Sequence, residues 1–356
     1  MKILHVITSL YTGGAERLML DLLPRLNDGD KHQVDLLLFN GVETPFKKSI
    51  MNCGIDVNWL AMTNDVYNPN RIIRMRKFLN GYDVIHTHNT ACQTFVPLAK
   101  MLTNTSAKLV TTEHSSNNWR RSKWWLKPID RWMYGRYSAI VCISDISRHN
   151  LERYVGKKNN IRLIPNGVDV ERFVRPIKDI TGQDRFEITM VAALRAEKDH
   201  ETMLNAMKHL PDNYHLRLVG GGVRNAELKA LVGNMGLDER VTFMGVRMDV
   251  PDLLEQSDIN VLSSHWEGFG LVAVEGMASG RPFVASDVDG LHDVVGGAGL
   301  LFPPGDDLQL ANEIRQLCEN PQEYRKVASR CQERAAQYDV NETARAYIDL
   351  YDSMLK

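Results

Sequence analysis

The chain has 356 residues, a formal net charge of −1 and 44% hydrophobic residues. At about 150 residues per domain, this length predicts two domains. The composition is that of an average globular protein and excludes disordered, collagen-like and repetitive classes. Charge is unevenly distributed, since residues 1–169 carry +9 and residues 170–356 carry −10. Such an asymmetry gives information about what the protein binds rather than about its fold.

The start of the chain resembles a short signal peptide, but its apolar run contains His5 and leads into Gly13-Gly14, so we expect a first β-strand there. No apolar run approaches the roughly 20 residues that a transmembrane helix needs. The five cysteines are scattered and lack a Cys-x-x-Cys pair, which favours reduced thiols. We therefore expect a cytoplasmic protein.

Short β-branched or Leu-rich runs alternate with amphipathic stretches throughout the chain. This alternation predicts βαβ units and parallel sheets with helices on both faces. The expected strands of the first half are residues 3–7, 34–39, 84–86, 109–112, 140–143 and 161–164. Those of the second half are 188–191, 216–219, 241–243, 259–262 and 282–285. Clear helical stretches are residues 15–26, 71–79, 271–279 and 340–355.

The polar stretch 172–184 separates the two halves and predicts an interdomain linker. We expect an α/β protein of two Rossmann-like, doubly wound parallel-sheet domains, residues 1–169 and 170–339, that face each other across a cleft. Ligands of such sheets bind outside the carboxyl ends of the strands. The final helix, within residues 340–356, is expected to pack back on the first domain.

Glycines follow two of the expected strands, as Gly13-Gly14 and as Gly220-Gly221-Gly222. Glycine lets a backbone approach an anion or another backbone closely. The Gly-x-Gly-x-x-Gly fingerprint of nicotinamide cofactors is absent. For the first pair taken alone a tight turn is the favoured interpretation, whereas the triplet indicates close contact with a ligand or with another backbone.

The segment 263–275 contains the strongest site signal, because a strand, a glycine-rich loop and a helix follow one another there. Loop amides near a helix N-terminus can hold a phosphate. Glu267 and Glu275 could accept hydrogen bonds from sugar hydroxyls. The alternative is a helix-capping loop with a solvated glutamate.

Several motifs in order resemble glycosyltransferase family 4, which has the GT-B fold. They are Asp83–His88, Ile164–Asp169, Leu218–Gly222, Val241–Gly245, the Glu-x₇-Glu element Glu267–Glu275 and Ser286–Gly290. The resemblance implies a retaining, nucleotide-sugar-dependent transferase without a cofactor. In this family the departing phosphate itself is thought to accept the acceptor proton, so no strong protein base is required.

The resemblance also implies roles for single residues. Glu275 would bind the ribose, and Glu267 the donor sugar at its reacting face. His114 would contact that sugar across the cleft. The other implied donor contacts are Phe269, Gly270, Leu271, Gly221, Gly222, the backbone around Gly245, Val246 and Arg247 at the base, and Gly13 and Gly14 at the phosphate or acceptor.

One position departs from the family pattern. Lys198 matches a lysine that binds the diphosphate, but Ala193 stands where the family has an arginine. Either Arg195 supplies the missing guanidinium, or Arg195 is solvated and Lys198 acts alone.

Two pairs of residues could suggest a metal. Asp287 and Asp289 form an Asp-x-Asp, but no further hard ligands surround them. His86 and His88 have no Cys or third His nearby in sequence, which favours a structural role. We therefore expect no metal.

The segment 119–127 combines three tryptophans with four cations, and residues 71–77 add four more cations. This composition is typical of an interfacial surface and suggests peripheral contact with an anionic membrane and a polyprenyl-diphosphate-linked acceptor. The alternative is a solvated basic face whose tryptophans fill the core. No nucleic-acid module is present, so we expect no nucleic acid as partner.

The expected reaction moves a hexosyl or N-acetylhexosaminyl group from a UDP-sugar, with GDP-mannose as second choice, to a glycan or lipid-linked acceptor. The resemblance alone places it in bacterial cell-surface polysaccharide synthesis. A nucleotide-sugar epimerase and a non-catalytic sugar-nucleotide-binding subunit are the alternatives.

Overall fold

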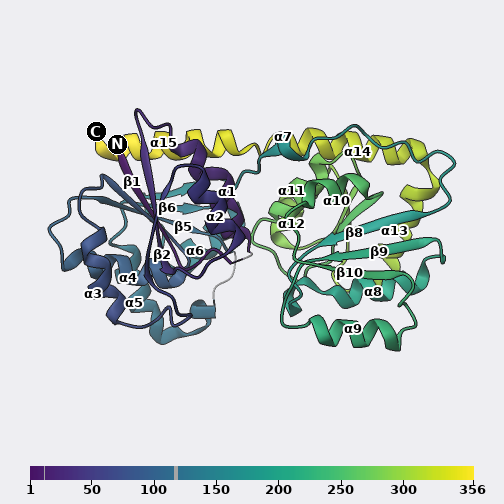
Figure 1. Cartoon of the computed structure of the whole chain (residues 1–356), viewed down its shortest axis with the longest axis horizontal. Coiled ribbons are helices and arrows are strands. Elements are labelled where there is room, and N and C mark those ends of the chain that lie inside the picture. Colours follow the sequence, from purple (N-terminus) through teal and green to yellow (C-terminus); the bar gives the residue numbers. More distant parts are fainter. Residues whose placement is uncertain (12, 116–118) are drawn as a thin grey trace. The chain divides into compact units, whose positions relative to one another are not determined.

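The computed structural model describes residues 1–11, 13–115 and 119–356, without the Trp119 side chain. The chain forms two compact units (Figure 1). Unit 1 comprises Met1–Gly167 and Val340–Lys356, and unit 2 comprises Val168–Asp339. Each is a parallel sheet with packed helices, which confirms the prediction of two doubly wound α/β domains.

The sheet of unit 1 has seven strands in the order β3-β2-β1-β4-β5-β6-β7. The order reverses between β1 and β4, and this reversal is the topological switch point where doubly wound sheets bind ligands. The strands are β1 (Lys2–Ile7), β2 (Gln33–Asn40), β3 (Asp56–Ala61), β4 (Val84–His88), β5 (Lys108–Glu113), β6 (Ala139–Cys142) and β7 (Ile161–Leu163).

The two faces of this sheet differ in chemistry. One face is apolar, with Leu4, Val6 and Ile85 in a core shared with α4 and α5. The other carries polar side chains and receives α15: the Tyr351 hydroxyl lies 2.6 Å from His86 Nδ1. The helices of unit 1 are α1 (Gly14–Leu26), α2 (Pro45–Asn52), α3 (Asn70–Met75), η1 (Arg76–Phe78), α4 (Thr90–Met101), η2 (Trp119–Ser122), η3 (Trp124–Leu126), α5 (Lys127–Tyr134), α6 (Asp145–Val155) and α15 (Val340–Leu355).

The sheet of unit 2 has the order β10-β9-β8-β11-β12-β13, with its switch point between β8 and β11. Its strands are β8 (Phe186–Val191), β9 (Tyr214–Val219), β10 (Val241–Gly245), β11 (Ile259–Leu262), β12 (Phe283–Ser286) and β13 (Leu300–Phe302). Its helices are α7 (Val170–Phe173), η4 (Ala196–Lys198), α8 (His200–His209), α9 (Asn225–Asn234), α10 (Val250–Gln256), α11 (Leu271–Ala278), α12 (Asp289–Val295), α13 (Asp307–Glu319) and α14 (Pro321–Ala336).

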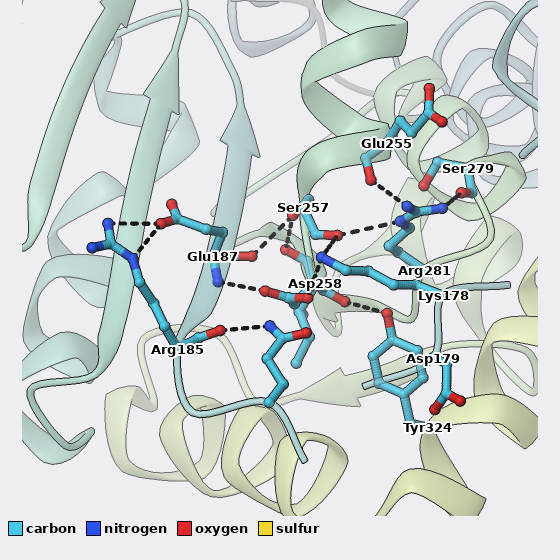
Figure 2. Close-up of polar contacts among 12 residues, drawn as sticks. Lys178, Asp179, Arg185, Glu187, Glu255, Ser257, Asp258, Ser279, Arg281 and Tyr324 are labelled. Atoms are coloured by element: carbon cyan, nitrogen blue, oxygen red, sulfur yellow. Dashed lines mark hydrogen bonds and ion pairs between the residues drawn. The ribbon is translucent and has the colours of Figure 1, made fainter. Parts of the chain in front are cut away.

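A buried polar network holds the amino ends of the strands in unit 2 (Figure 2). The Asp258 carboxylate accepts from the Glu187 amide at 2.7 Å and pairs with Lys178 Nζ at 2.6 Å. The Tyr324 hydroxyl donates to the Asp258 carbonyl at 2.8 Å. Because Lys178 and the buried Ile180 belong to stretch 172–184, that stretch packs into unit 2, and the prediction of a linker there is wrong.

Candidate functional site

The switch point of unit 2 brings together two residues that are 69 positions apart. Lys198 ends η4, which follows β8, and Glu267 lies in the loop that follows β11. Lys198 Nζ donates to Glu267 Oε2, and each side chain is less than one-fifth exposed. A cation and a carboxylate are thus held at the edge where this class of sheet binds ligands.

Backbone contacts fix the two loops that carry this pair. Ser263 Oγ donates to the Asp199 carbonyl at 2.7 Å, and the His265 amide donates to the Glu197 carbonyl at 2.9 Å. The loop after β11 is therefore tied to the segment after β8. This linkage sets the position of Glu267 relative to Lys198.

The loop runs into α11 through a residue that must be glycine. Gly270 has φ +86°, and an added Cβ would lie 2.6 Å from Leu291 Cδ2. Phe269 is buried with its ring edge-on to Tyr338, at 5.3 Å between centroids. The first turn of α11 leaves amides free of helical acceptors at this edge, and Glu275 is buried about one turn further along.

The glycine triplet is explained by backbone packing at two of its three positions. An added Cβ on Gly220 would lie 2.0 Å from the Ala192 carbonyl oxygen, and one on Gly222 would lie 2.3 Å from that of Leu194. At Gly221 it would meet only the Val246 side chain, at 2.8 Å. Of the two interpretations of the triplet, close contact with another backbone accounts for Gly220 and Gly222.

Of the remaining expected donor contacts of unit 2, Leu271 is buried at the start of α11, and Arg195, Val246 and Arg247 are exposed. The Arg195 side chain is 58% exposed and lies 3.8 Å from Glu197. Val246 is exposed after β10, and Arg247 Nε donates to Asp249 at 2.8 Å.

In unit 1, Gly13 caps α1 beside the switch point, and both Gly13 and Gly14 are exposed. The sequence interpretation missed Asn89, which directly follows β4. Its backbone, at φ 68° and ψ 151°, occupies a region normally restricted to glycine, and its Nδ2 donates to Thr8 Oγ1 at 3.2 Å. Strain of this kind costs about 1–3 kcal/mol and clusters at functional sites. The signal available in sequence is only an Asn between a strand and a helix.

His114 follows β5 at the same edge of unit 1. Its Nε2 lies 2.9 Å from His88 Nδ1. Burial lowers the pKa of His114 to about 4, so the imidazole is neutral at pH 7.

The structure supplies a third histidine beside His86 and His88. In the described part of the chain, nitrogens of His5, His86 and His88 lie within 4.8 Å of one another. His5 comes from β1 and is distant in sequence, so the sequence interpretation did not include it. Asp287 is engaged elsewhere, since its Oδ1 lies 2.6 Å from His292 Nδ1.

The tryptophan-rich segment lies between β5 and α5 in the chain and exposes large apolar side chains. We call Trp124, Trp125, Ile129 and Trp132 the tryptophan face; they are 84%, 55%, 48% and 37% exposed. The alternative that these tryptophans fill the core is therefore wrong for Trp124 and Trp125.

Some of the neighbouring cations are internal. Arg120 is paired with the buried Asp130, and Arg121 lies 3.0 Å from the buried Glu113. Arg71 is also buried and donates to backbone carbonyls, including that of Asp65 at 2.6 Å. The outward charges near the tryptophan face are Lys123, Arg131 and Arg136.

A second basic surface lies at the opposite edge of this sheet. Arg74, Arg76 and Lys77 line an open depression of about 600 Å³ together with Asn80 and Thr103. None of the helices in the described residues combines the length and apolarity required to cross a bilayer.

Two family models match the chain, Glycosyltransferase Family 4 over residues 12–172 and Glycosyl transferases group 1 over residues 172–337. EpsD of Bacillus subtilis (strain 168), which bears the name of a glycosyltransferase, is 27% identical over 297 residues, 77% of each chain. The UDP-Gal:alpha-D-GlcNAc-diphosphoundecaprenol alpha-1,3-galactosyltransferase of Escherichia coli is 29% identical over 236 residues, 60% of each chain.

Among solved structures, Anabaena HepE in complex with UDP-glucose is similar in fold. Its TM-score is 0.87 at 24% identity, and the match covers 99% of this chain and 100% of that chain. The two family models together span residues 12–337 and meet at residue 172, close to the boundary between the units. The chain therefore belongs to glycosyltransferase family 4 and is a glycosyltransferase with the GT-B fold.

Proposed function

We propose that the protein is a retaining transferase that uses a UDP-sugar and acts on a lipid-linked acceptor, in cell-surface polysaccharide synthesis. The Lys198–Glu267 contact at the switch point of unit 2 is the observation that carries the proposal. It joins the two side chains expected at the diphosphate and at the donor sugar. The E. coli relative, whose name contains both UDP-galactose and an undecaprenol diphosphate, supports this donor and this acceptor.

The chemistry follows from charge. The bond between the anomeric carbon and the diphosphate oxygen breaks, and the nucleoside diphosphate gains negative charge. Lys198 and the amides of Phe269, Gly270 and Leu271 stabilise that charge. The acceptor oxygen then bonds to the anomeric carbon on the face that the diphosphate leaves, and its proton passes to the departing phosphate.

In this scheme Glu267 has two partners. Without donor it neutralises Lys198, and with donor it accepts hydrogen bonds from sugar hydroxyls while Lys198 turns to the diphosphate. Glu275 binds the ribose, the backbone at Val246 and Arg247 meets the base, and His114 contacts the donor sugar. Gly13 and Gly14 leave space for the phosphate or the acceptor. No metal takes part.

The acceptor side rests on the tryptophan face. Exposed tryptophans beside Lys123, Arg131 and Arg136 suit the headgroup region of an anionic membrane. Trp124 and Trp125 lie between the carboxyl end of β5 and the start of α5, close in the chain to His114. A membrane-bound diphosphate acceptor would thereby be presented at the reacting edge, on the cytoplasmic face.

The test is transfer from radiolabelled UDP-sugars to an undecaprenyl-diphosphate-linked sugar in excess EDTA. We expect a lipid-linked product that has the α-configuration of its donor. Donor hydrolysis or epimerisation without transfer would reject the proposal, and so would a requirement for Mg²⁺ or Mn²⁺. Binding of UDP-sugar without turnover would identify the non-catalytic alternative.

A further inference from the structure

Four histidines lie on one face of the unit 1 sheet. His5 is paired in register with His86 on β1 and β4, and His88 is opposite Thr112 on β5. His114 is two residues beyond Thr112. Because alternate residues of a strand share a face, these side chains lie on one side of the sheet, where Tyr351 of α15 contacts His86. His5, His86 and His88 are fully buried.

Three of the four are joined in a line. His5 Nδ1 lies 2.9 Å from His88 Nε2, and His88 Nδ1 lies 2.9 Å from His114 Nε2. The ring centroids are 5.2 Å apart for His5 and His88 and 5.1 Å apart for His88 and His114. Each of these distances is the nitrogen separation plus about one ring radius on either side. The bonds therefore run along the rings, as an N–H···N bond requires. We call His5, His88 and His114 the histidine chain.

His86 is not a link of this chain. Its nitrogens lie 2.6 Å from the Tyr351 hydroxyl and 2.8 Å from Thr112 Oγ1. Its ring stacks on that of His88, with 4.4 Å between centroids. His86 therefore supports the orientation of the His88 ring without exchanging a proton with it.

The spacing suits hydrogen bonds better than a metal centre. Zinc binds each histidine nitrogen at about 2.0 Å, so two nitrogens of a tetrahedral site stand roughly 3.3 Å apart with both lone pairs aimed at the metal. In the histidine chain, the nitrogens of each bond are aimed at each other at 2.9 Å.

Burial keeps all three rings neutral at pH 7. It lowers the pKa of His5 to about 3, that of His114 to about 4, and that of His88 well below its usual value. Each neutral ring carries one proton. Two of the three protons lie in the two hydrogen bonds, and the third lies on an outer nitrogen, either His5 Nε2 or His114 Nδ1. If it lies on His114 Nδ1, all three rings carry their proton on Nδ1. If it lies on His5 Nε2, all three rings carry it on Nε2.

The two possible states differ at the ends of the histidine chain. Both outer nitrogens are buried and lack a partner in the described structure. A buried N–H without an acceptor is less favourable than a buried nitrogen lone pair without a donor. The unpaired N–H therefore costs less free energy at His114, where a substrate oxygen can accept it, than at the fully buried His5. Conversion of the Nδ1–H state to the Nε2–H state needs a proton to enter at His5 Nε2 and another to leave at His114 Nδ1, and the reverse conversion needs the opposite. Because His5 is fully buried, both conversions are hindered.

We propose that His5 and His88 are positioning residues that lock His114 as its Nδ1–H tautomer, so that Nδ1 donates to an oxygen of the bound sugar. The assignment of a sugar to His114 rests on the proposed function, whereas the shared tautomer does not. The charge on His114 stays zero, and its ring plane is held by His88.

The direct test is long-range ¹H–¹⁵N NMR of the full chain labelled with [¹⁵N]histidine. Signals of the three rings are assigned with His5→Phe, His88→Phe and His114→Phe. We expect the Nδ1–H form at His5, His88 and His114 in the wild type, and the same result in Tyr351→Phe, which changes only the partner of His86. An Nε2–H form at any of the three overturns the proposal.

A kinetic test addresses the consequence for transfer. His88→Asn keeps an amide near the Nδ1 position but ends the link to His5, and His88→Phe removes both. Loss of a hydrogen-bond partner of a functional imidazole costs about 10- to 100-fold at metal sites, and we expect a kcat decrease of that order for His88→Phe with UDP binding unchanged. His88→Asn should restore much of kcat only if it fixes the same tautomer.

The outcomes separate the two proposals. A wild type that transfers no sugar but shows the shared Nδ1–H tautomer rejects the proposed function and leaves the tautomer lock standing. An active wild type whose kcat is unchanged in a folded His88→Phe variant rejects the positioning role.

Discussion

At the scale of single residues, the charge on Lys198 should account for much of the rate. Lys198→Ala removes the cation that meets the leaving diphosphate, so we expect kcat to fall by about 10²-fold or more.

Arg195→Ala decides between the two interpretations of the missing family arginine. A fall of similar size would show that Arg195 reaches the diphosphate despite its exposure, and an unchanged rate would show that Lys198 acts alone.

Asn89 offers a test of stored strain. Asn89→Gly and Asn89→Ala both lose the bond to Thr8, but only glycine adopts this backbone without strain. We expect the glycine variant to exceed the alanine variant in unfolding free energy by about 1–3 kcal/mol, measured by urea unfolding. Equal stabilities would show that the Asn89 backbone is not strained.

At the scale of secondary structure elements, α15 is held by buried hydrogen bonds. Tyr351→Phe leaves His86 Nδ1 buried without its partner, and such a loss costs about 1–3 kcal/mol. Thermal unfolding should therefore begin at a lower temperature in this variant. Tyr338→Phe, whose hydroxyl donates to the Asp293 carbonyl at 3.4 Å in an exposed position, is the control and should lose less stability than Tyr351→Phe.

The histidines also predict a pH dependence. His5 and His114 titrate near pH 3 and 4 when folded but near 6.5 when unfolded, so the unfolded chain binds more protons below pH 6.5. Each of the two histidines therefore leaves the free energy of unfolding unchanged above pH 6.5. As the pH falls from 6.5 toward 4, each lowers the free energy of unfolding by about 1.4 kcal/mol per pH unit. His5→Phe should lessen the slope of unfolding free energy against pH in this range, and an unaltered slope would contradict the assignment.

The elements were largely predictable because their signals are local. Hydrophobic periodicity gave the final helix its bounds and placed most strands within two residues. β3 was missed because it is mostly exposed and contains Asp56 and Asn58, and β13 because it has only three residues. The stretch 172–184 looked like a linker, since the partners that bury Ile180 are distant in sequence.

The site was predictable only in part. Motifs singled out Glu267 and Lys198, but the contact between them at the β8–β11 switch point depends on strand order. The His5–His88 bond depends on register between strands 83 residues apart, and no local pattern reports register between such strands. The strain at Asn89 is likewise a property of its backbone, and the residue type alone does not predict it.

At the scale of the whole molecule, the basic character of residues 1–169 should assist membrane contact. Part of that charge is internal, because Arg71 is buried and because Arg120 and Arg121 pair with the buried Asp130 and Glu113. We expect flotation with anionic vesicles at low salt, and loss of most binding in a Trp124→Ala/Trp125→Ala variant because the exposed rings no longer insert. Equal flotation of the double variant would contradict a role for the tryptophan face.

Under the proposed function, unit 2 binds uridine diphosphate at the β8–β11 switch point. Calorimetric titration of UDP into the whole chain in EDTA measures this binding. Glu275→Gln should weaken binding about tenfold or more, because a carboxylate hydrogen bond of about 1.5–3 kcal/mol is lost. Glu255→Gln, on α10 beside Arg175 and away from that edge, should bind like the wild type. No binding of UDP to the wild type, or equal binding by Glu275→Gln, would contradict the claim.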